Sequence, residues 1–376
     1  DNVVVGANAG KSITGGTNNT FIGDYAGATT TSVVGVVGIG TACLENGNLD
    51  TDANNTVAIG ASALTALISG AKNIAIGKSA MASATLSTNS IAIGYEAMDA
   101  MVGDDATNAG THNIAIGTDA MGTYNGGTHD DSAIDGNVCI GTNAGLGGNF
   151  SGNSRLASEN VVIGYNAMDG SGAYNSYYNV YIGGNAGGGS YGGGDNYENV
   201  GIGWGAMNGA QNGCRGNVVI GNLTGAALTT GQFNTLVGDN AGNDITSANK
   251  TVFIGRNAGD AVTTTGGSNE SDGTVGIGYS ALGALTSGAG NVAIGYKAGG
   301  SITTANYNIA IGSGSLATMA TGNGSNVAIG TEVMHLLPNA GNDNTAVGNR
   351  AMLNANDGAA DQNVCIGSQA GKTLTS

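Results

Sequence analysis

A short motif recurs twenty times along this 376-residue chain, and the repeat constrains the fold more than any other feature. Regular copies read N-V-x-I-G-x-x-A-G, and the Gly after the apolar run serves here as the reference position. Eight of the nineteen spacings between reference glycines are 17 residues, and the others run from 18 to 24. Such a period indicates one supersecondary unit per copy, stacked on its neighbours to bury a continuous core. The reference glycines are residues 6, 23, 40, 60, 77, 94, 117, 141, 164, 183, 203, 221, 238, 255, 278, 295, 312, 330, 348 and 367.

The residues before the reference Gly read as a short strand. Ile or Val precedes the Gly in all twenty copies, and Val, Ile or Thr stands three residues before it in all twenty. These positions are two apart, so they share one face of a strand. The residue between them varies, with Phe21, Ala75 and Tyr181 as examples. We therefore expect the Ile/Val pair to fill the coil interior and the central residue to face a less uniform environment.

Other columns of the repeat suggest how the coils are held together. Asn stands four residues before the reference Gly in fifteen copies, including Asn73, Asn113, Asn291 and Asn363. Stacked side-chain amides can bond to the coils above and below, so we predict a structural ladder. Ala stands three residues after the Gly in sixteen copies, and the next residue is always Gly, Met or Leu. This regular spacing favours core packing of the Met residues.

These patterns predict an all-β fold, a parallel β-solenoid (β-roll or β-helix) of about twenty coils of 17–24 residues. A coil of 17 residues holds one well-marked strand, a turn and a weaker return segment, which favours a flattened roll. The chain has 71 Gly, one Pro and no Gly-X-Y period, which excludes collagen. Residues 1–376 are expected to form a single tandem-repeat domain.

Two stretches depart from the regular repeat. Three consecutive long spacings mark residues 95–164 as coils with long inserts, which should leave the stack as loops. Residues 165–204 hold seven of the thirteen Tyr and the only Trp. Aromatic faces with polar tips suit sugars and protein surfaces, but the same rings can also cover Gly-rich loops or pack between subunits. The candidate ligand or interface residues are Tyr174, Tyr177, Tyr178, Tyr191, Tyr197 and Trp204.

The strings NTFIGDYAG, NVAIGYKAG and NSIAIGYEA resemble the NSVAIG-like head repeats of trimeric autotransporter adhesins, and also NTFIGxxAG arrays of phage tail fibres and bacterial surface proteins. The resemblance covers essentially the whole chain, although these spacings are longer than is usual in adhesin heads. It implies left-handed parallel β-rolls, three of which associate around a common axis and bind host or matrix surfaces.

Composition and motif spacing exclude several function classes. The net charge of −16 and the lack of Lys/Arg clusters argue against nucleic acid. The most apolar stretch, residues 56–71, is interrupted by Gly and Ser, so we expect no membrane insertion by this segment. Four cysteines stand far apart without metal spacing and read as small buried residues. The P-loop-like string GANAGKS has one residue too few between its glycines.

We expect no enzyme activity, no catalytic residues and no cofactor. A weak Ca²⁺ site is conceivable at Asp104 with Asp105, or at Asp130, Asp131 and Asp135, because hard cations favour clustered carboxylates. These residues match neither the EF-hand loop nor the GGxGxDxUx motif of calcium-binding rolls, and we expect no metal site.

The leading functional hypothesis is an extracellular, cell-surface or virion fibre segment with an adhesive role. It would be a homotrimer that binds a receptor or glycan through its inserted loops. The alternative is a filament subunit that stacks end to end and has no ligand. Ice binding would need a flat, regular Thr column, whereas the exposed residues after the reference Gly vary widely.

Overall fold

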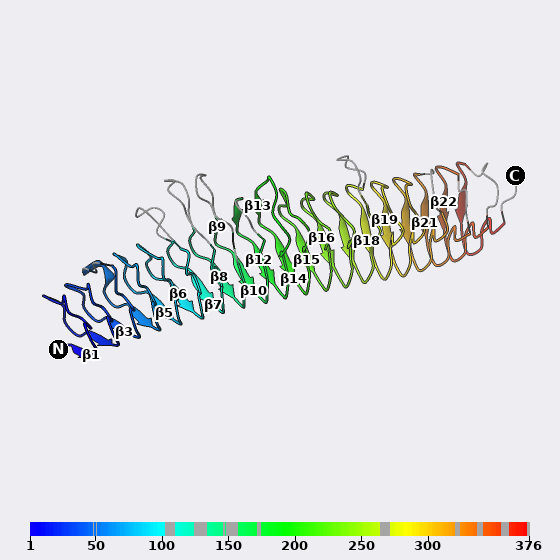
Figure 1. Cartoon of the computed structure of the whole chain (residues 1–376). Coiled ribbons are helices and arrows are strands. Elements are labelled where there is room, and N and C mark those ends of the chain that lie inside the picture. Colours follow the sequence, from blue (N-terminus) through cyan, green and yellow to red (C-terminus); the bar gives the residue numbers. More distant parts are fainter. Residues whose placement is uncertain are drawn as a thin grey trace. The chain divides into compact units, whose positions relative to one another are not determined.

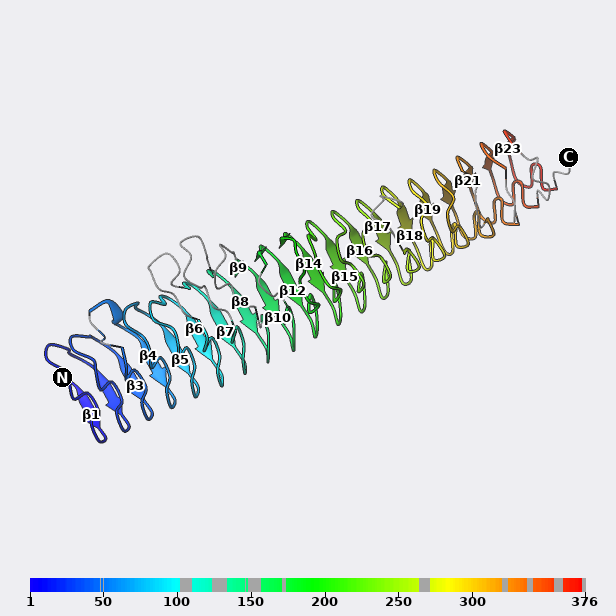
Figure 2. The same ribbon diagram turned by 45° about the horizontal axis from the view of Figure 1, so that its top comes forward.

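The computed structural model describes residues 1–47, 49, 51–101, 110–123, 134–145, 147, 157–170, 174–263, 271–319, 324–336, 341–354 and 361–373. The chain divides into two compact units, Asp1–Glu198 and Asn199–Ser376. Within each unit, successive coils lie side by side, with one short strand of every coil in a common ladder (Figures 1 and 2).

Every strand of the two ladders is three residues long and ends just before a reference Gly. Unit 1 contains β1 (Val3–Val5), β2 (Thr20–Ile22), β3 (Val37–Ile39), β4 (Val57–Ile59), β5 (Ile74–Ile76), β6 (Ile91–Ile93), β7 (Ile114–Ile116), β8 (Val138–Ile140), β10 (Val161–Ile163) and β12 (Val180–Ile182), with one 3₁₀ turn, η1 (Thr51–Ala53). Unit 2 contains β14 (Val200–Ile202), β15 (Val218–Ile220), β16 (Thr235–Val237), β17 (Val252–Ile254), β18 (Val275–Ile277), β19 (Val292–Ile294), β20 (Ile309–Ile311), β21 (Val327–Ile329), β22 (Thr345–Val347) and β23 (Val364–Ile366).

Neighbouring strands of a ladder are parallel and in repeat register. In unit 2, for example, Val275 pairs with Val292 and Ile277 pairs with Ile294. Each residue therefore meets its equivalent in the next coil, whatever the length of the chain between them. The predicted parallel β-solenoid is confirmed.

The return segment is less regular than a two-stranded roll requires. Among the described residues, it forms strands in only three coils, β9 (Ala157–Ser158), β11 (Ser176–Tyr177) and β13 (Asn196–Tyr197), which make a separate parallel sheet. A residue with positive φ, such as Glu159 at 56°, turns the chain between this sheet and the main ladder. The same corner conformation recurs five residues before the reference Gly in other coils, for example at Lys72 (62°) and Lys250 (55°).

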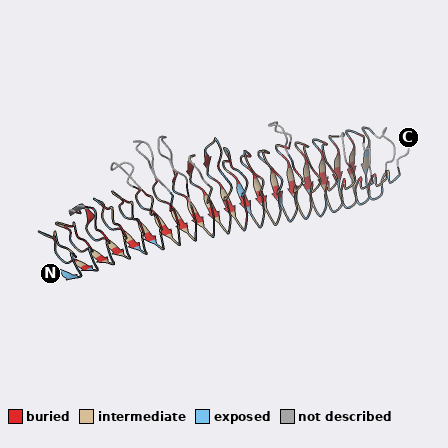
Figure 3. Ribbon diagram, in the orientation of Figure 1, coloured by how far each residue is buried: buried red, intermediate tan, exposed pale blue. Residues whose placement is uncertain are grey.

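The expected orientation of the main strands is wrong. The central residue points inward, and the Ile/Val pair points outward. In β5, Ala75 is fully buried whereas Ile76 is 36% exposed. The aromatic centres Tyr181 and Phe253 are also fully buried. Figure 3 shows the buried strand centres in red. The central position varies because the coil interior is filled by different residue combinations from coil to coil.

Two positions share that interior, and their sizes compensate. The second is the residue four after the reference Gly. A Cβ on Gly259 would lie only 2.7 Å from Phe253 ring atoms, so the large ring requires Gly there. Where the strand centre is Ala75, the second position holds the fully buried Met81. The buried Met residues of the repeat, as predicted, belong to the core: Met81, Met98, Met121, Met168, Met207, Met334 and Met352.

The reference Gly is required by both backbone conformation and space. Gly77 has φ of 139°, and a Cβ on it would overlap the carbonyl oxygen of Gly94 in the next coil, at 2.1 Å. The glycine column therefore lets the coils approach at the turn that follows each strand.

Candidate interaction surface

The outward residues of the main ladder form an apolar stripe, which we call the Ile/Val face. It comprises the residues one and three positions before each reference Gly. In unit 1, Ile76 and Ile93 are each 36% exposed. In unit 2, Val218, Ile220 and Ile294 are 37%, 37% and 38% exposed. The in-register pairing stacks these side chains in two columns, so their exposed surfaces join into one patch.

The Ile/Val face carries no charged side chain along the described strands. Its positions hold only Val, Ile and three Thr, at Thr20, Thr235 and Thr345, although the chain has a net charge of −16. Ten coils at about 4.8 Å spacing, with columns about 7 Å apart, give each unit a stripe of roughly 300 Å² in projection. A contiguous patch of this size is comparable to the largest apolar patch of a typical monomer, which is often functional.

The Asn column lies buried beside the ladder and connects successive coils. The Asn291 side-chain oxygen accepts the Asn308 backbone N–H at 2.9 Å and its amide Nδ2–H at 3.1 Å. Its own amide donates to the Ala305 carbonyl at 2.8 Å. Asn113 bonds in the same way to Asn137 and to the Ile134 carbonyl. Each amide therefore satisfies buried backbone groups of the next coil as well as its own bonding needs.

The other two proposed ladder residues follow variants of this pattern. Asn73 accepts the backbone N–H of Ser90 at 3.1 Å, but Ser replaces Asn in that coil and supplies no side-chain amide as a second donor. Asn363 donates its backbone N–H and its amide to the Asn344 side-chain oxygen, each at 3.0 Å. It is only partly buried.

A second ladder, six residues before the reference Gly, was missed by the sequence analysis. The Asp272 carboxylate accepts the Asn249 backbone N–H at 2.7 Å, and the Asn249 side-chain oxygen accepts the Gln232 N–H at 2.9 Å. In unit 1, Asp135 accepts the Thr111 N–H at 2.6 Å. This column holds ten different residue types, from Asn, Asp and Thr to Tyr, Arg and Gly, so it lacks the residue identity that made the first ladder visible.

Three of the candidate aromatic residues lie together in unit 1. The Tyr177 and Tyr197 rings are stacked at 5.0 Å with 5° between their planes, and Tyr178 meets Tyr177 edge-on at 5.3 Å. Tyr178 is 51% exposed. Burial is the largest cause that raises the pKa of Tyr177 above its ordinary value. These three rings form an aromatic cluster, which we call the Tyr edge.

The remaining candidates are not part of the Tyr edge. Tyr191 is 5% exposed and belongs to the core, so it is not a surface contact. Tyr174 is half-buried. Trp204 is 55% exposed and lies in unit 2.

The sequence matches no protein-family model and no curated protein. Among the described residues, no helix is long and apolar enough to cross a membrane.

An acidic cluster lines a cavity of about 430 Å³ in unit 1. It contains Glu96, Asp99 and Asp119, and burial together with the two neighbouring carboxylates raises the pKa of Asp99 to about 6. No trio of His, Cys, Asp or Glu in the described ranges is arranged to hold a metal ion. Of the suggested Ca²⁺ ligands, Asp135 instead belongs to the second ladder. The others, Asp104, Asp105, Asp130 and Asp131, lie outside the described residues.

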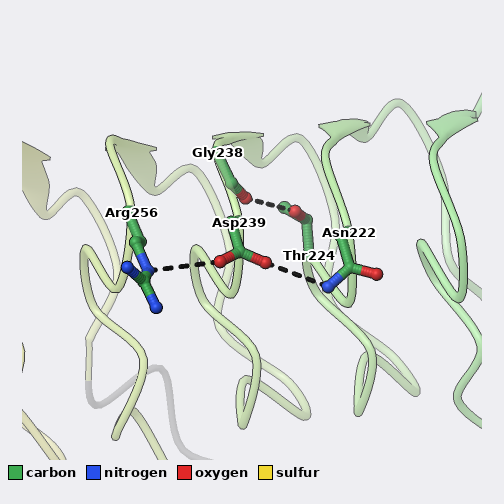
Figure 4. Close-up of polar contacts among 5 residues, drawn as sticks. All are labelled: Asn222, Thr224, Gly238, Asp239 and Arg256. Atoms are coloured by element: carbon green, nitrogen blue, oxygen red, sulfur yellow. Dashed lines mark hydrogen bonds and ion pairs between the residues drawn. The ribbon is translucent and has the colours of Figure 1, made fainter.

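The edge after the reference Gly carries paired polar groups in unit 2. Asp239 lies between the Arg256 guanidinium, at 3.2 Å, and the Asn222 amide, at 3.0 Å (Figure 4). The Thr224 hydroxyl donates to the Gly238 carbonyl, above this row in Figure 4. The contacts among Asn222, Asp239 and Arg256 join equivalent positions of successive coils, and they pair the exposed Arg256 with a carboxylate.

Burial controls the chemistry of three of the four cysteines. Cys43, Cys139 and Cys214 are buried, as the sequence indicates, whereas Cys365 is partly exposed. Burial raises the pKa of the Cys139 thiol to about 12 and that of Cys43 to about 11. These two thiols therefore remain protonated, and their side chains act as small core residues.

Proposed function

We propose that the chain is a segment of an extracellular, cell-surface or virion fibre, in which copies associate through the Ile/Val face. The observation that carries this proposal is the uncharged stripe of partly exposed Ile and Val side chains on a strongly acidic chain. Burying that stripe removes apolar surface from water without desolvating a charge.

A second copy of this chain is the partner that the stripe fits best. The stripe repeats at about 4.8 Å along the coil stack, and another copy presents side chains at the same interval. A globular partner would lack this periodicity. The resemblance to trimeric adhesin heads further supports association of identical copies, and it favours three of them.

The mass of the protein in solution tests the proposal. We expect light scattering to give a discrete multiple of 36.4 kDa, three times that value for a trimer, across a range of concentrations. A mass of one chain at every concentration would contradict association. Filaments that lengthen with concentration would contradict a discrete assembly and would support end-to-end stacking instead.

An adhesive role is a second proposed function, favoured by the exposed Tyr edge. Tyr178 has φ of 59°, a conformation that Asn tolerates well, so Tyr178→Asn removes the ring with little backbone strain. We expect this variant to lose binding to cell surfaces that retain the unmodified protein while its solution mass stays the same. Unchanged binding would exclude the Tyr edge as the adhesive site.

A further inference from the structure

A polar pocket of about 350 Å³ opens on unit 2, and its lining includes no residue of the Ile/Val face. Its walls come from consecutive coils, at the residues five, six and eight positions before the reference Gly. The residues that matter for its chemistry are Arg215, Gln232, Phe233, Asn249, Lys250 and Asp272. The volume lies at the lower end of the range for small-molecule sites, about 300–1,000 Å³, and suits a single sugar ring.

The pocket is a positive spot on an acidic chain. Arg215 and Lys250 contribute two positive charges and Asp272 one negative charge, which leaves a formal charge of +1, whereas the chain as a whole carries −16. Two other cations of unit 2 are neutralised by ion pairs, Arg256 with Asp239 and Arg350 with Glu332. Among the described residues, no ion pair involves the exposed Lys250 ammonium.

The polar wall is fixed in place by hydrogen bonds between coils. The Arg215 Nε donates to the Gln232 side-chain oxygen at 2.9 Å, and the Gln232 backbone N–H donates to the Asn249 side chain at 2.9 Å. Asp272 in turn accepts the Asn249 backbone N–H at 2.7 Å. A ligand would therefore meet side chains whose positions are already set, which lowers the entropy cost of binding.

An aromatic ring completes the pocket. Phe233 is 46% exposed, and the Arg215 guanidinium lies 5.0 Å from its ring centroid. The ring also covers Gly216 of the preceding coil, where a Cβ would come within 2.7 Å of it. Phe233 is therefore held against the coil stack while nearly half of its surface stays available to an apolar ligand face.

We propose that this pocket binds a sugar ring that bears a carboxylate. The Phe233 surface takes the apolar C–H face of the ring, and the Lys250 ammonium pairs with the carboxylate in the field of the Arg215 guanidinium. Amide and hydroxyl side chains of the wall meet the sugar hydroxyls. This activity goes beyond the fibre role and requires neither the Tyr edge nor self-association.

Unit 1 provides an internal comparison. A cavity of about 540 Å³ there is lined by Lys72, which has the same place in the repeat as Lys250. The positions that correspond to Phe233 and Arg215 hold Asn55 and Val34, so this cavity has neither the ring nor the second cation. The proposal therefore assigns no acidic-sugar binding to the Lys72 cavity.

Titration with methyl glucuronide, followed by NMR at low ionic strength, tests the assignment. Methyl glucoside lacks only the carboxylate, and acetate lacks the ring. We expect the glucuronide to bind with a Kd of about 1 mM and both comparison compounds to bind at least ~10-fold more weakly. Equal binding of the glucoside would show that the cations do not contribute to binding. Equal binding of acetate would show that the sugar ring does not contribute.

Two substitutions locate the binding. Lys250→Asn and Phe233→Asn suit the positive φ of these residues, 55° and 59°, and each should weaken glucuronide binding at least ~10-fold. Lys72→Asn, at φ of 62°, is the matched control and should leave binding unchanged. Circular dichroism and solution mass should be unaltered in all three. If Phe233→Asn does not fold, the affinity of Lys250→Asn for the glucuronide tests the proposal. Unchanged affinity in Lys250→Asn would overturn the proposal without affecting the fibre role.

Discussion

Replacing Gly259 with Leu should destabilise unit 2 by about 3 kcal/mol or more, although Leu is the natural residue at this repeat position in other coils. Leu282 and Leu316 occupy it at φ of 54° and 46°, beside the small strand centres Gly276 and Ala310. At Gly259 the strand centre is Phe253, and the added Cβ alone would come within 2.7 Å of the ring. The cost therefore comes mainly from overpacking of the coil interior.

A second substitution should reverse this cost. Phe253→Ala alone leaves a cavity and should cost about 3–5 kcal/mol. Combined with Gly259→Leu, it recreates the Ala–Leu pair of the Ala310 coil, so the double variant should regain most of the lost stability. Urea unfolding followed by circular dichroism measures all three.

The matched control is Leu316→Met, because Met334 fills this position beside Ala328 in another coil. It should change the free energy of unfolding by less than ~1.5 kcal/mol. A double variant no more stable than the single ones would mean that the two positions do not share the interior in the way described.

Three lysines on the Ile/Val face should convert the assembly to single chains. Ile220, Ile254 and Ile294 are 37%, 37% and 38% exposed, so an isolated chain can keep lysine ammonium groups in water at these positions. In an assembly that covers the face, each ammonium would lose its water at a cost of several kcal/mol. Association should weaken at least ~1000-fold, and light scattering should give 36.4 kDa.

Overall charge does not explain this expected result. Three lysines change the net charge from −16 to −13, which reduces repulsion between chains. Ser313→Lys provides the control, because Ser313 is exposed one residue after a reference Gly, where Lys78 and Arg256 occur naturally. Its mass should equal that of the unmodified protein. An undiminished mass in the triple variant would exclude this face as the contact between copies.

The sequence alone was sufficient to predict the solenoid, because the recurring Gly and Asn are residues that the backbone of each coil requires. Gly77 allows a close approach that a Cβ would prevent, and Asn291 satisfies buried backbone groups of the next coil. Both needs recur in each coil, so both residues recur in the sequence. The same logic correctly assigned Met81 and Cys139 to the core.

The sequence did not show in the same way which face of each strand is buried. Uniform Ile and Val suggested a core, but uniformity arose on the outer face, where each side chain meets its equivalent in the next coil. The interior instead varies from Ala75 to Phe253, because a partner position elsewhere in the coil compensates for size. Strand periodicity establishes that two residues share a face, and it does not identify the buried one.

The candidate sites were predictable only in part. Aromatic clustering located Tyr177, Tyr178 and Tyr197, which the fold brings together. It also selected Tyr191, which is buried because its place in the coil points inward. The pocket around Lys250 has no sequence signature, since its walls join residues about one coil apart and become neighbours only through stacking.

Hydroxyl-radical labelling of the protein in solution tests most directly whether the Ile/Val face is covered by another copy. Ile76 and Ile93 on the face are each 36% exposed, and Ile68, which lies off the face in the same unit, is 50% exposed. An uncovered face would be oxidised at about 0.7 times the rate of Ile68, the ratio of 36% to 50%. We expect the two face residues to be almost unlabelled at concentrations where the assembly is present. Oxidation in proportion to their exposure would show that the face is open to water and would contradict the account.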